Sequence, residues 1–284
     1  MNKILVLAAR NLLRYRRRTG LTAFLIVIGV VAVLVFVAVT GSFKSLIIGQ
    51  ITDSFLGHVQ VHRRGYVASV ESLPLNMNLP GPMAERVKKV LEATDQVEAV
   101  APRIKFGAMF SNFTETTSVR VNGIDPDAEA RVSPLLAKRQ NSGTALPNLL
   151  ARGEMLVPDL VARGLQVKAG DTIVLVATNR DGSVNGKTFL IRGTLESATG
   201  PGGRDGYIHL DDAHELLRID AGEITEFAVR ARKAAGAEAL AQKLATAFSD
   251  VRNKEGRPVV EVHPWQRLSR SEEHTSELQS QSTI

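Results

Sequence analysis

The hydrophobic and polar positions divide the chain into one unbroken apolar run near its start and a long stretch of short alternating patterns after it. No charged residue stands between Arg18 and Lys44, and the middle of this interval reads LTAFLIVIGVVAVLVFVAV, Leu21–Val39. At about 1.5 Å of rise per residue, roughly 20 apolar residues cross a bilayer core of about 30 Å. The run therefore predicts one transmembrane helix, which we place at residues 19–41.

A cleaved secretory signal is the alternative explanation of this run. The apolar part of such a signal covers about 7–15 residues and ends at a small-x-small cleavage site. The run here is longer, and Ala38–Thr40 is a poor candidate for such a site. The length favours a retained helix over a secreted enzyme released by cleavage near Thr40.

Apolar residues recur at four-residue spacing beyond the span, as they do along one face of a helix. They are Phe43, Ile47, Ile51 and Phe55. The helix is therefore predicted to continue as a stalk over residues 42–56, with these four side chains as its contact stripe. Such a stripe needs a partner, either the following domain or a second helix from the same or another chain.

Residues 57–269 combine short strand patterns with short helix patterns, which predicts an α+β domain, in two lobes. The predicted strands are 57–62, 97–110, 117–124, 171–178, 187–195, 206–210, 224–231 and 258–262. The predicted helices are 83–93, 156–164, 211–218 and 237–248. The stretches 125–143 and 200–206 are rich in Pro, Gly and Asp and are predicted to be loops.

Basic residues are concentrated in residues 1–18, ahead of the span. They are Lys3, Arg10, Arg14, Arg16, Arg17 and Arg18, with no acidic residue among them. Removing these six from the 35 Lys and Arg residues leaves 29, which equals the number of Asp and Glu residues, so the net charge of +6 belongs to this segment. That distribution disfavours a nucleic-acid-binding protein.

The same charges predict the topology. The positive-inside rule places residues 1–18 in the cytoplasm and the large domain on the other side of the membrane. On a helix the segment has a basic and an apolar stripe, which suits contact with anionic membrane lipid. A topology signal without a further role explains the charges equally well.

The sequence predicts no catalytic, cofactor-binding or metal-binding residue. The chain has no cysteine, which excludes disulfides and thiolate metal sites. GSVNGKT, Gly182–Thr188, lacks the spacing of a phosphate-binding loop, and Asn185-Gly186 is predicted to be a hairpin turn. HELLR, His214–Arg218, lacks the second His of a zinc-peptidase helix. His58 and His62 stand roughly 13 Å apart on a predicted strand, too far for one ion, and are expected on an exposed polar face.

The order of these features resembles that of FtsX-like ABC transporter permeases, which include the lipoprotein-releasing LolC/LolE type and the macrolide exporter MacB type. The resemblance covers nearly all of residues 1–268. It rests on the basic entry NLLRYRRRTG, the single span, ARGEMLVPDLVARGLQVKAGDTIVLV followed by a hairpin, GYIHLDDAHELL and ITEFAVRA. It implies a MacB-like periplasmic core domain at the bacterial inner membrane.

The resemblance also implies a function and partners. The chain would be a permease subunit of a mechanotransmitting transporter, itself neither an enzyme nor a cofactor-binding protein. Its partners would be a separate ABC ATPase, a second permease copy or paralogue and, in the LolC/LolE type, lipoprotein cargo. LolC-type members recruit a carrier through a long, proline-bearing hairpin, whereas the corresponding ATNRDGSVNGK is short and polar, so a LolE-like, MacB-like or other export role stays open.

The end of the sequence departs from the family pattern. Family members have three further spans after the domain, and this sequence ends before them. RSEEHTSELQS, Arg270–Ser280, resembles the translation of a common sequencing adapter, so we expect residues 270–284 to be an artefact and the three spans to be missing. The alternative function is a single-pass, membrane-anchored periplasmic binding or adaptor module without an ATPase.

Overall fold

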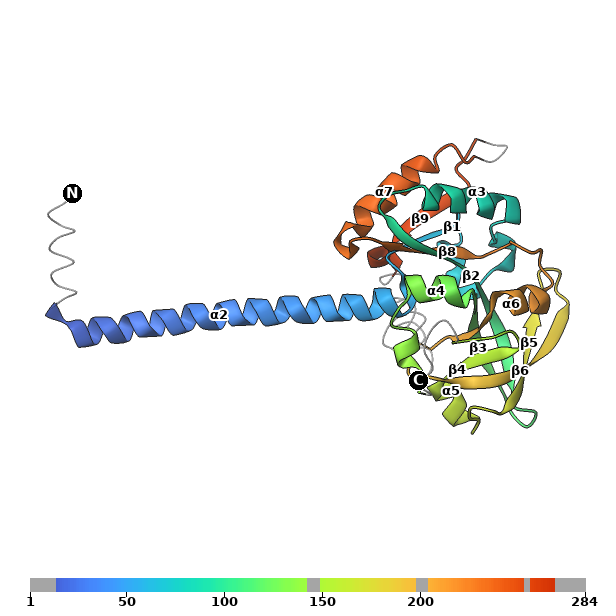
Figure 1. The fold of residues 1–284 in the computed structure, drawn as a ribbon, viewed down its shortest axis with the longest axis horizontal. Coiled ribbons are helices and arrows are strands. Elements are labelled where there is room, and N and C mark those ends of the chain that lie inside the picture. The colour runs from blue at the N-terminus through green and yellow to red at the C-terminus, as the bar shows by residue number, and fades with distance from the viewer. Residues whose placement is uncertain (1–13, 142–148, 198–203, 253–255, 269–284) are drawn as a thin grey trace. The chain divides into compact units, whose positions relative to one another are not determined.

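The structure is a computed structural model that describes residues 14–141, 149–197, 204–252 and 256–268. The helices are α2 (Arg16–Ile51), α3 (Gly81–Glu92), α4 (Pro126–Val132), α5 (Asp159–Gly164), α6 (Leu210–Leu217) and α7 (Ala237–Ala247). The strands are β1 (Val59–Arg63), β2 (Val97–Ser111), β3 (Thr116–Ile124), β4 (Glu154–Pro158), β5 (Thr172–Thr178), β6 (Val184–Leu195), β7 (Gly206–His209), β8 (Glu226–Ala231) and β9 (Val260–Pro264). The chain forms two compact units, residues 1–49 and 50–284 (Figure 1). The segment 270–284 lies outside the described residues.

Helix α2 contains the apolar run and continues without a break to Ile51. Its 36 residues are about 54 Å long at a rise of about 1.5 Å per residue. By length and composition the helix could cross a membrane, and none of its most apolar window is buried. A π-helical turn, Thr52–Leu56, follows it directly.

Six strands of the domain close into a barrel. The order is β2-β3-β7-β4-β6-β5, and β5 pairs with β2 again to complete the ring. The pairs β3–β7 and β4–β6 are parallel, and the others are antiparallel. Helix α6 packs closely against β3 at Gly123. A Cβ atom at this position would lie 2.4 Å from the Cβ atom of Ala213, so only glycine leaves room for the helix. The barrel therefore depends on a glycine in its wall.

The first half of β2 leaves the barrel and forms a second, open sheet. Residues 97–103 pair with β8, which pairs with β1, which pairs with β9, all antiparallel. Helices α3 and α7 lie beside these strands (Figure 1). Each buries apolar residues at helical spacing: Ala84, Val87 and Leu91 on α3, and Leu240, Ala241 and Leu244 on α7. The domain therefore has an open part and a closed part that share β2.

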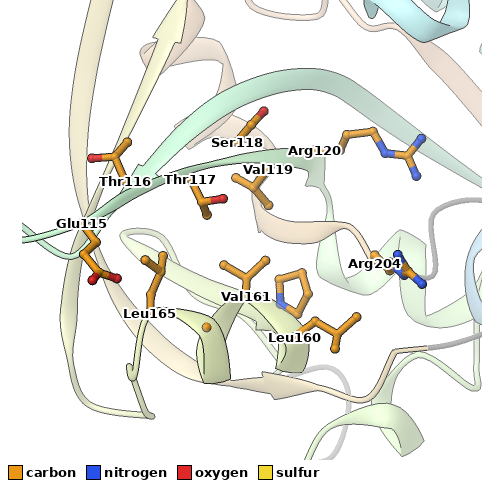
Figure 2. A pocket seen from close by; sticks show the side chains of 12 residues that line it. Glu115, Thr116, Thr117, Ser118, Val119, Arg120, Leu160, Val161, Leu165 and Arg204 are labelled. Carbon is orange, nitrogen blue, oxygen red and sulfur yellow. The ribbon is translucent and has the colours of Figure 1, made fainter. Parts of the chain in front are cut away.

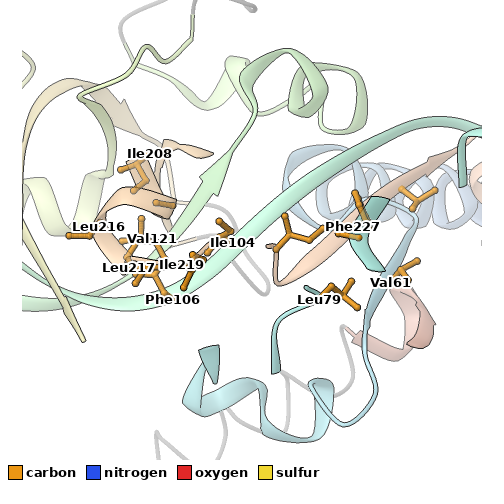
Figure 3. Packing of buried hydrophobic residues seen from close by; sticks show 14 of the residues in the cluster. Val61, Leu79, Ile104, Phe106, Val121, Ile208, Leu216, Leu217, Ile219 and Phe227 are labelled. Atoms are coloured by element: carbon orange, nitrogen blue, oxygen red, sulfur yellow. The ribbon is translucent and has the colours of Figure 1, made fainter. Parts of the chain in front are cut away.

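One large apolar core runs through both parts. Figure 3 shows buried side chains around Phe106, Val121 and Ile208 in the barrel, and others around Val61 and Phe227 in the open sheet. Strand β2 passes between the two groups. This strand contributes Val97 to the core in the open part, and Ile104, Phe106, Ala108 and Phe110, which alternate along the strand, in the barrel.

The α+β fold predicted from the pattern is confirmed, with three local corrections. Residues 154–158 form strand β4, so the helix predicted from residue 156 begins only at Asp159. Residues 126–132 form helix α4 within a predicted loop. The turn after β5 covers residues 179–183, with Gly182 at φ +85° and Ser183 N–H donating to Asp181. Asn185 and Gly186 belong to β6 and pair with β5.

Candidate functional site

The basic residues ahead of the span are only partly described. Lys3 and Arg10 lie outside the described residues. Arg14, Arg16, Arg17 and Arg18 are exposed at the start of α2 or just before it. Their role at the membrane surface stays a prediction.

The predicted contact stripe of the stalk divides into two pairs. Phe43 and Ile47 are exposed, with 64% and 47% of their surface accessible. Phe55 is buried in a small cluster with Leu56 and Leu268, against which Ile51 is partly buried. Only the first pair is therefore accessible for contact with another chain.

The π-helical turn at residues 52–56 is held to the domain by hydrogen bonds from several elements. The Asp53 carboxylate accepts from Arg230 at 2.7 Å, and its backbone carbonyl accepts from the Leu135 amide at 2.9 Å. The carbonyl of Phe55 accepts from Arg103 Nη1 at 2.6 Å. Such turns leave backbone groups without their usual helical partners and often mark functional positions. Here β2, β8 and the segment after α4 supply the partners.

Arg103 is the centre of this arrangement and is 2% exposed. It lies on β2 where this strand pairs with β8 on one side and β3 on the other. Its Nε and Nη2 atoms donate to both carboxylate oxygens of Glu129 on α4, at 2.8 and 2.6 Å. Further bonds go to Ser133 at 3.1 Å and Glu226 at 3.3 Å. With the Phe55 carbonyl, all five N–H donors of the guanidinium have acceptors.

Glu226 on β8 connects Arg103 to two more bases. Its carboxylate lies 3.2 Å from Lys105 Nζ and 3.0 Å from His62 Nε2. Burial alone would raise the pKa of Glu226, but Lys105, His62 and Arg103 outweigh it and lower that pKa. Burial would likewise lower the pKa of Arg103, but Glu129 and Glu226 raise it. Both groups therefore stay charged in the interior.

His62 is part of the same cluster in its neutral form. Burial lowers the pKa of His62 despite the hydrogen bond to Glu226, so Nε2 donates a proton to the carboxylate. Its ring stacks on Tyr66 with centroids 5.2 Å apart. We call Arg103, Glu129, Glu226, Lys105 and His62, with the carbonyl of Phe55, the junction network.

The junction network corrects the prediction for the first strand of the domain. His58 and His62 were expected on an exposed polar face, but they are 3% and 1% exposed. Gln60 between them is also buried and donates to the Leu56 carbonyl at 2.9 Å. The alternating polar side chains of this strand therefore face a layer of buried polar groups and not solvent. Periodicity alone does not separate such a layer from solvent.

The central residues of the network were not singled out from the sequence. One signal for Glu129 was present, because Asp125-Pro126 is a typical start of a helix. The Asp125 carboxylate accepts from the amides of Asp127 and Ala128, as an N-cap does. The signal for Arg103 was weaker, a cation in the middle of an apolar strand.

The arrangement couples the start of the domain structurally to α4, β2 and β8. In the part of the chain that the structure describes, no group of three His, Cys, Asp or Glu residues could hold a metal ion. His214 Nε2 hydrogen-bonds the Glu223 carbonyl at 2.8 Å. The residues of the junction network hold the start of the domain to α4, β2 and β8.

The chain is similar to several known proteins. The family described as MacB-like periplasmic core domain matches residues 19–247. The lipoprotein-releasing system transmembrane protein LolE of Haemophilus influenzae is 26% identical over 98 residues, which cover 34% of this chain and 23% of that protein. The chain thus matches less than a quarter of the length of this relative.

Two solved structures are similar. The periplasmic region of MacB from Actinobacillus actinomycetemcomitans has a TM-score of 0.50 and 11% identity, over 77% of this chain and 94% of that one. The extracellular domain of the ABC-type transporter YknZ from Gram-positive bacteria has a TM-score of 0.46 and 13% identity, over 73% and 98%. The family match and the MacB structure confirm the resemblance to FtsX-like permeases and the fold class predicted from it.

Proposed function

Because the chain belongs to the family of MacB-like periplasmic core domains, we propose that it is a permease subunit of a mechanotransmitting ABC transporter. In this proposal residues 1–18 are cytoplasmic, α2 crosses the inner membrane, and the domain after residue 56 is periplasmic. ATP is hydrolysed by a separate ATPase subunit, and a second permease copy or paralogue completes the transporter.

The junction network is the observation that carries this proposal. A transmitting subunit needs a stiff connection between the stalk and the domain. The residues that follow α2 directly, Thr52–Leu56, are held by a buried arginine whose donors are all used. Removing one partner of such a buried pair costs roughly 3–5 kcal/mol, because the other charge is left without compensation. Displacement of the turn is therefore expected to move β2 and β8 with it.

The proposal for the cargo rests on one short sequence match. The short match to a lipoprotein-releasing system protein makes a lipoprotein the first cargo to test. The turn at residues 179–183 is short, so this proposal does not include recruitment of a carrier by that hairpin.

Site-directed crosslinking of the stalk tests the function. The sequence has no cysteine, so a single introduced cysteine reports one position. We expect Phe43→Cys and Ile47→Cys to form disulfide-linked pairs in membranes that also contain the candidate ABC ATPase of the transporter. Trapping that ATPase with ATP and vanadate should change the yield of disulfide-linked pairs at least about threefold. Leu46→Cys is the matched control, since it is also exposed but lies off the predicted stripe.

Two outcomes separate the candidate functions. Crosslinking at Phe43 and Ile47 that responds to the trapped ATPase supports the permease. A chain that fails to associate with any ATPase, and whose crosslinking ignores ATP, would instead be a single-pass anchored module.

A further inference from the structure

Strand β3 is longer than the neighbour that should cover it. It has nine residues, whereas β7 has four and pairs only with residues 121–124. Residues 116–120 pair with β2 on one side. On the other side, no strand among the described residues pairs with them. The barrel wall therefore has an open strand edge about five residues long.

The register shows which backbone groups face this edge. The Asn112 amide donates to the Glu115 carbonyl across the hairpin at 3.2 Å, which makes this a hydrogen-bonded pair. Such pairs alternate along an antiparallel ladder, so Thr117 and Val119 bond to β2. Thr116 and Ser118 direct their backbone N–H and C=O groups to the open side. Within the described chain, no partner is found for these groups.

A groove of about 720 Å³ runs between this edge and helix α5. Figure 2 shows residues 116–120 of β3 on one side of it and α5 on the other. Its apolar lining includes Leu160, Val161 and Leu165. Leu160 is 44% exposed, so part of this apolar lining is accessible. We call this feature the edge groove.

The two ends of the edge groove carry opposite charges. Glu115 lies at one end, and Arg120 and Arg204 lie at the other (Figure 2). Asp205 pairs with Arg120 at 3.0 Å, and Arg204 is exposed. A strand of five residues is roughly 16 Å long, which fits the open part of β3. A ligand with one basic and one acidic end would complement these charges.

We propose that the edge groove binds an extended segment of a partner polypeptide, which adds to β3 as a strand in line with β7. Backbone hydrogen bonds to Thr116 and Ser118 supply affinity, and alternate apolar side chains enter the groove toward α5, as in other cases of strand addition. The partner segment carries a basic residue near Glu115 and an acidic residue near Arg204. This site does not depend on the proposed transport function.

Binding of a short labelled peptide tests the proposal. The probe is a six-residue peptide of alternating Val and Thr with Lys at one end and Glu at the other, made in both orders. Fluorescence anisotropy measures its binding to the full chain in detergent micelles. We expect saturable binding, tighter for one order of charges. N-methylation of the backbone amides on one edge of the peptide should weaken binding at least about tenfold, and methylation of the other edge should not.

A pair of protein variants locates the bound strand. Ser118→Pro removes the backbone donor that faces the groove without removing a bond to β2, and should weaken binding at least about tenfold. Ser118→Ala keeps the donor and should bind like the unchanged chain. If Ser118→Pro does not fold, the methylated peptides still decide the question.

Three results would overturn the proposal: no binding of either peptide, equal loss on methylation of both edges, or equal binding by the two Ser118 variants. Saturable binding of a fluorescent fatty acid without peptide binding would assign the edge groove to an acyl chain.

Discussion

The junction network involves β2 and the edge groove involves its paired neighbour β3, and the polar groups of the two regions are in opposite situations. At Arg103 the charges are fully buried, and every donor of the guanidinium has an acceptor. Along Thr116–Arg120 the backbone of a strand edge faces an open groove with apolar lining. One region is therefore complete in the isolated chain, and the other is suited to a partner. Stability should depend on the first, and binding on the second.

The largest expected effect comes from Arg103→Ala. This change leaves Glu129 buried without its counter-charge and removes one of the three basic partners of Glu226, and should lower the free energy of unfolding by roughly 3–5 kcal/mol. Denaturant unfolding followed by tryptophan fluorescence measures it. The control is Arg163→Ala, which removes an exposed pair with Asp159 on α5 and should cost about 0.3–0.5 kcal/mol. Similar losses for the two variants would contradict a special role for the junction network.

A smaller effect on the free energy of unfolding is expected from a decrease in pH. The pKa of His62 is lowered from its ordinary value of 6.5, so the folded state binds fewer protons than the unfolded state below that pH. The free energy of unfolding should therefore fall as the pH decreases below about 6.5, by up to about 1.4 kcal/mol per pH unit. The pKa of Glu226 is also lowered, so the free energy of unfolding should fall further as the pH decreases below 4.5, the ordinary pKa of a glutamate.

His62→Gln is the variant that isolates this pH effect. Glutamine can still donate to Glu226 but does not titrate, so the slope between pH 6.5 and 5 should decrease. His209→Asn keeps the N-cap of α6 and should retain the slope. An unchanged slope in His62→Gln would assign the titration to another group.

The smallest effect is expected at the edge groove. Leu160→Ser replaces a half-exposed side chain, so the free energy of unfolding should change by less than about 0.5 kcal/mol. Binding of the strand-like peptide should fall severalfold in the same variant. A large loss of stability without loss of binding would show that Leu160 belongs to the core, and would remove the contrast between the two regions.

The sequence predicted the regular elements better than their pairing. Apolar alternation located most strands, and the run Leu21–Val39 located α2, because these signals are local. Strand β4 was missed because its apolar residues Met155–Val157 stand directly before Pro158, and a proline is typical of the start of a helix.

The site was harder to predict for a physical reason. The partners of Arg103 are 26 and 123 residues away along the chain, so no local pattern brings them together. His62 and Gln60 looked like a solvated face because a polar strand face has the same period whether water or buried ions cover it. The edge groove depends on the different lengths of β3 and β7, which become visible only when their register is known.

Strand β2 has a mechanical consequence of its own. Its fifteen residues run without interruption from the open sheet into the barrel wall, so no flexible linker separates the two parts. We therefore expect the two parts to move relative to each other by twisting or bending of β2 and not about a flexible linker. A torque applied near Arg103 would therefore reach the hairpin beyond Ser111 as a twist of β2 and of its paired strand β3, whose residues 116–120 line the edge groove.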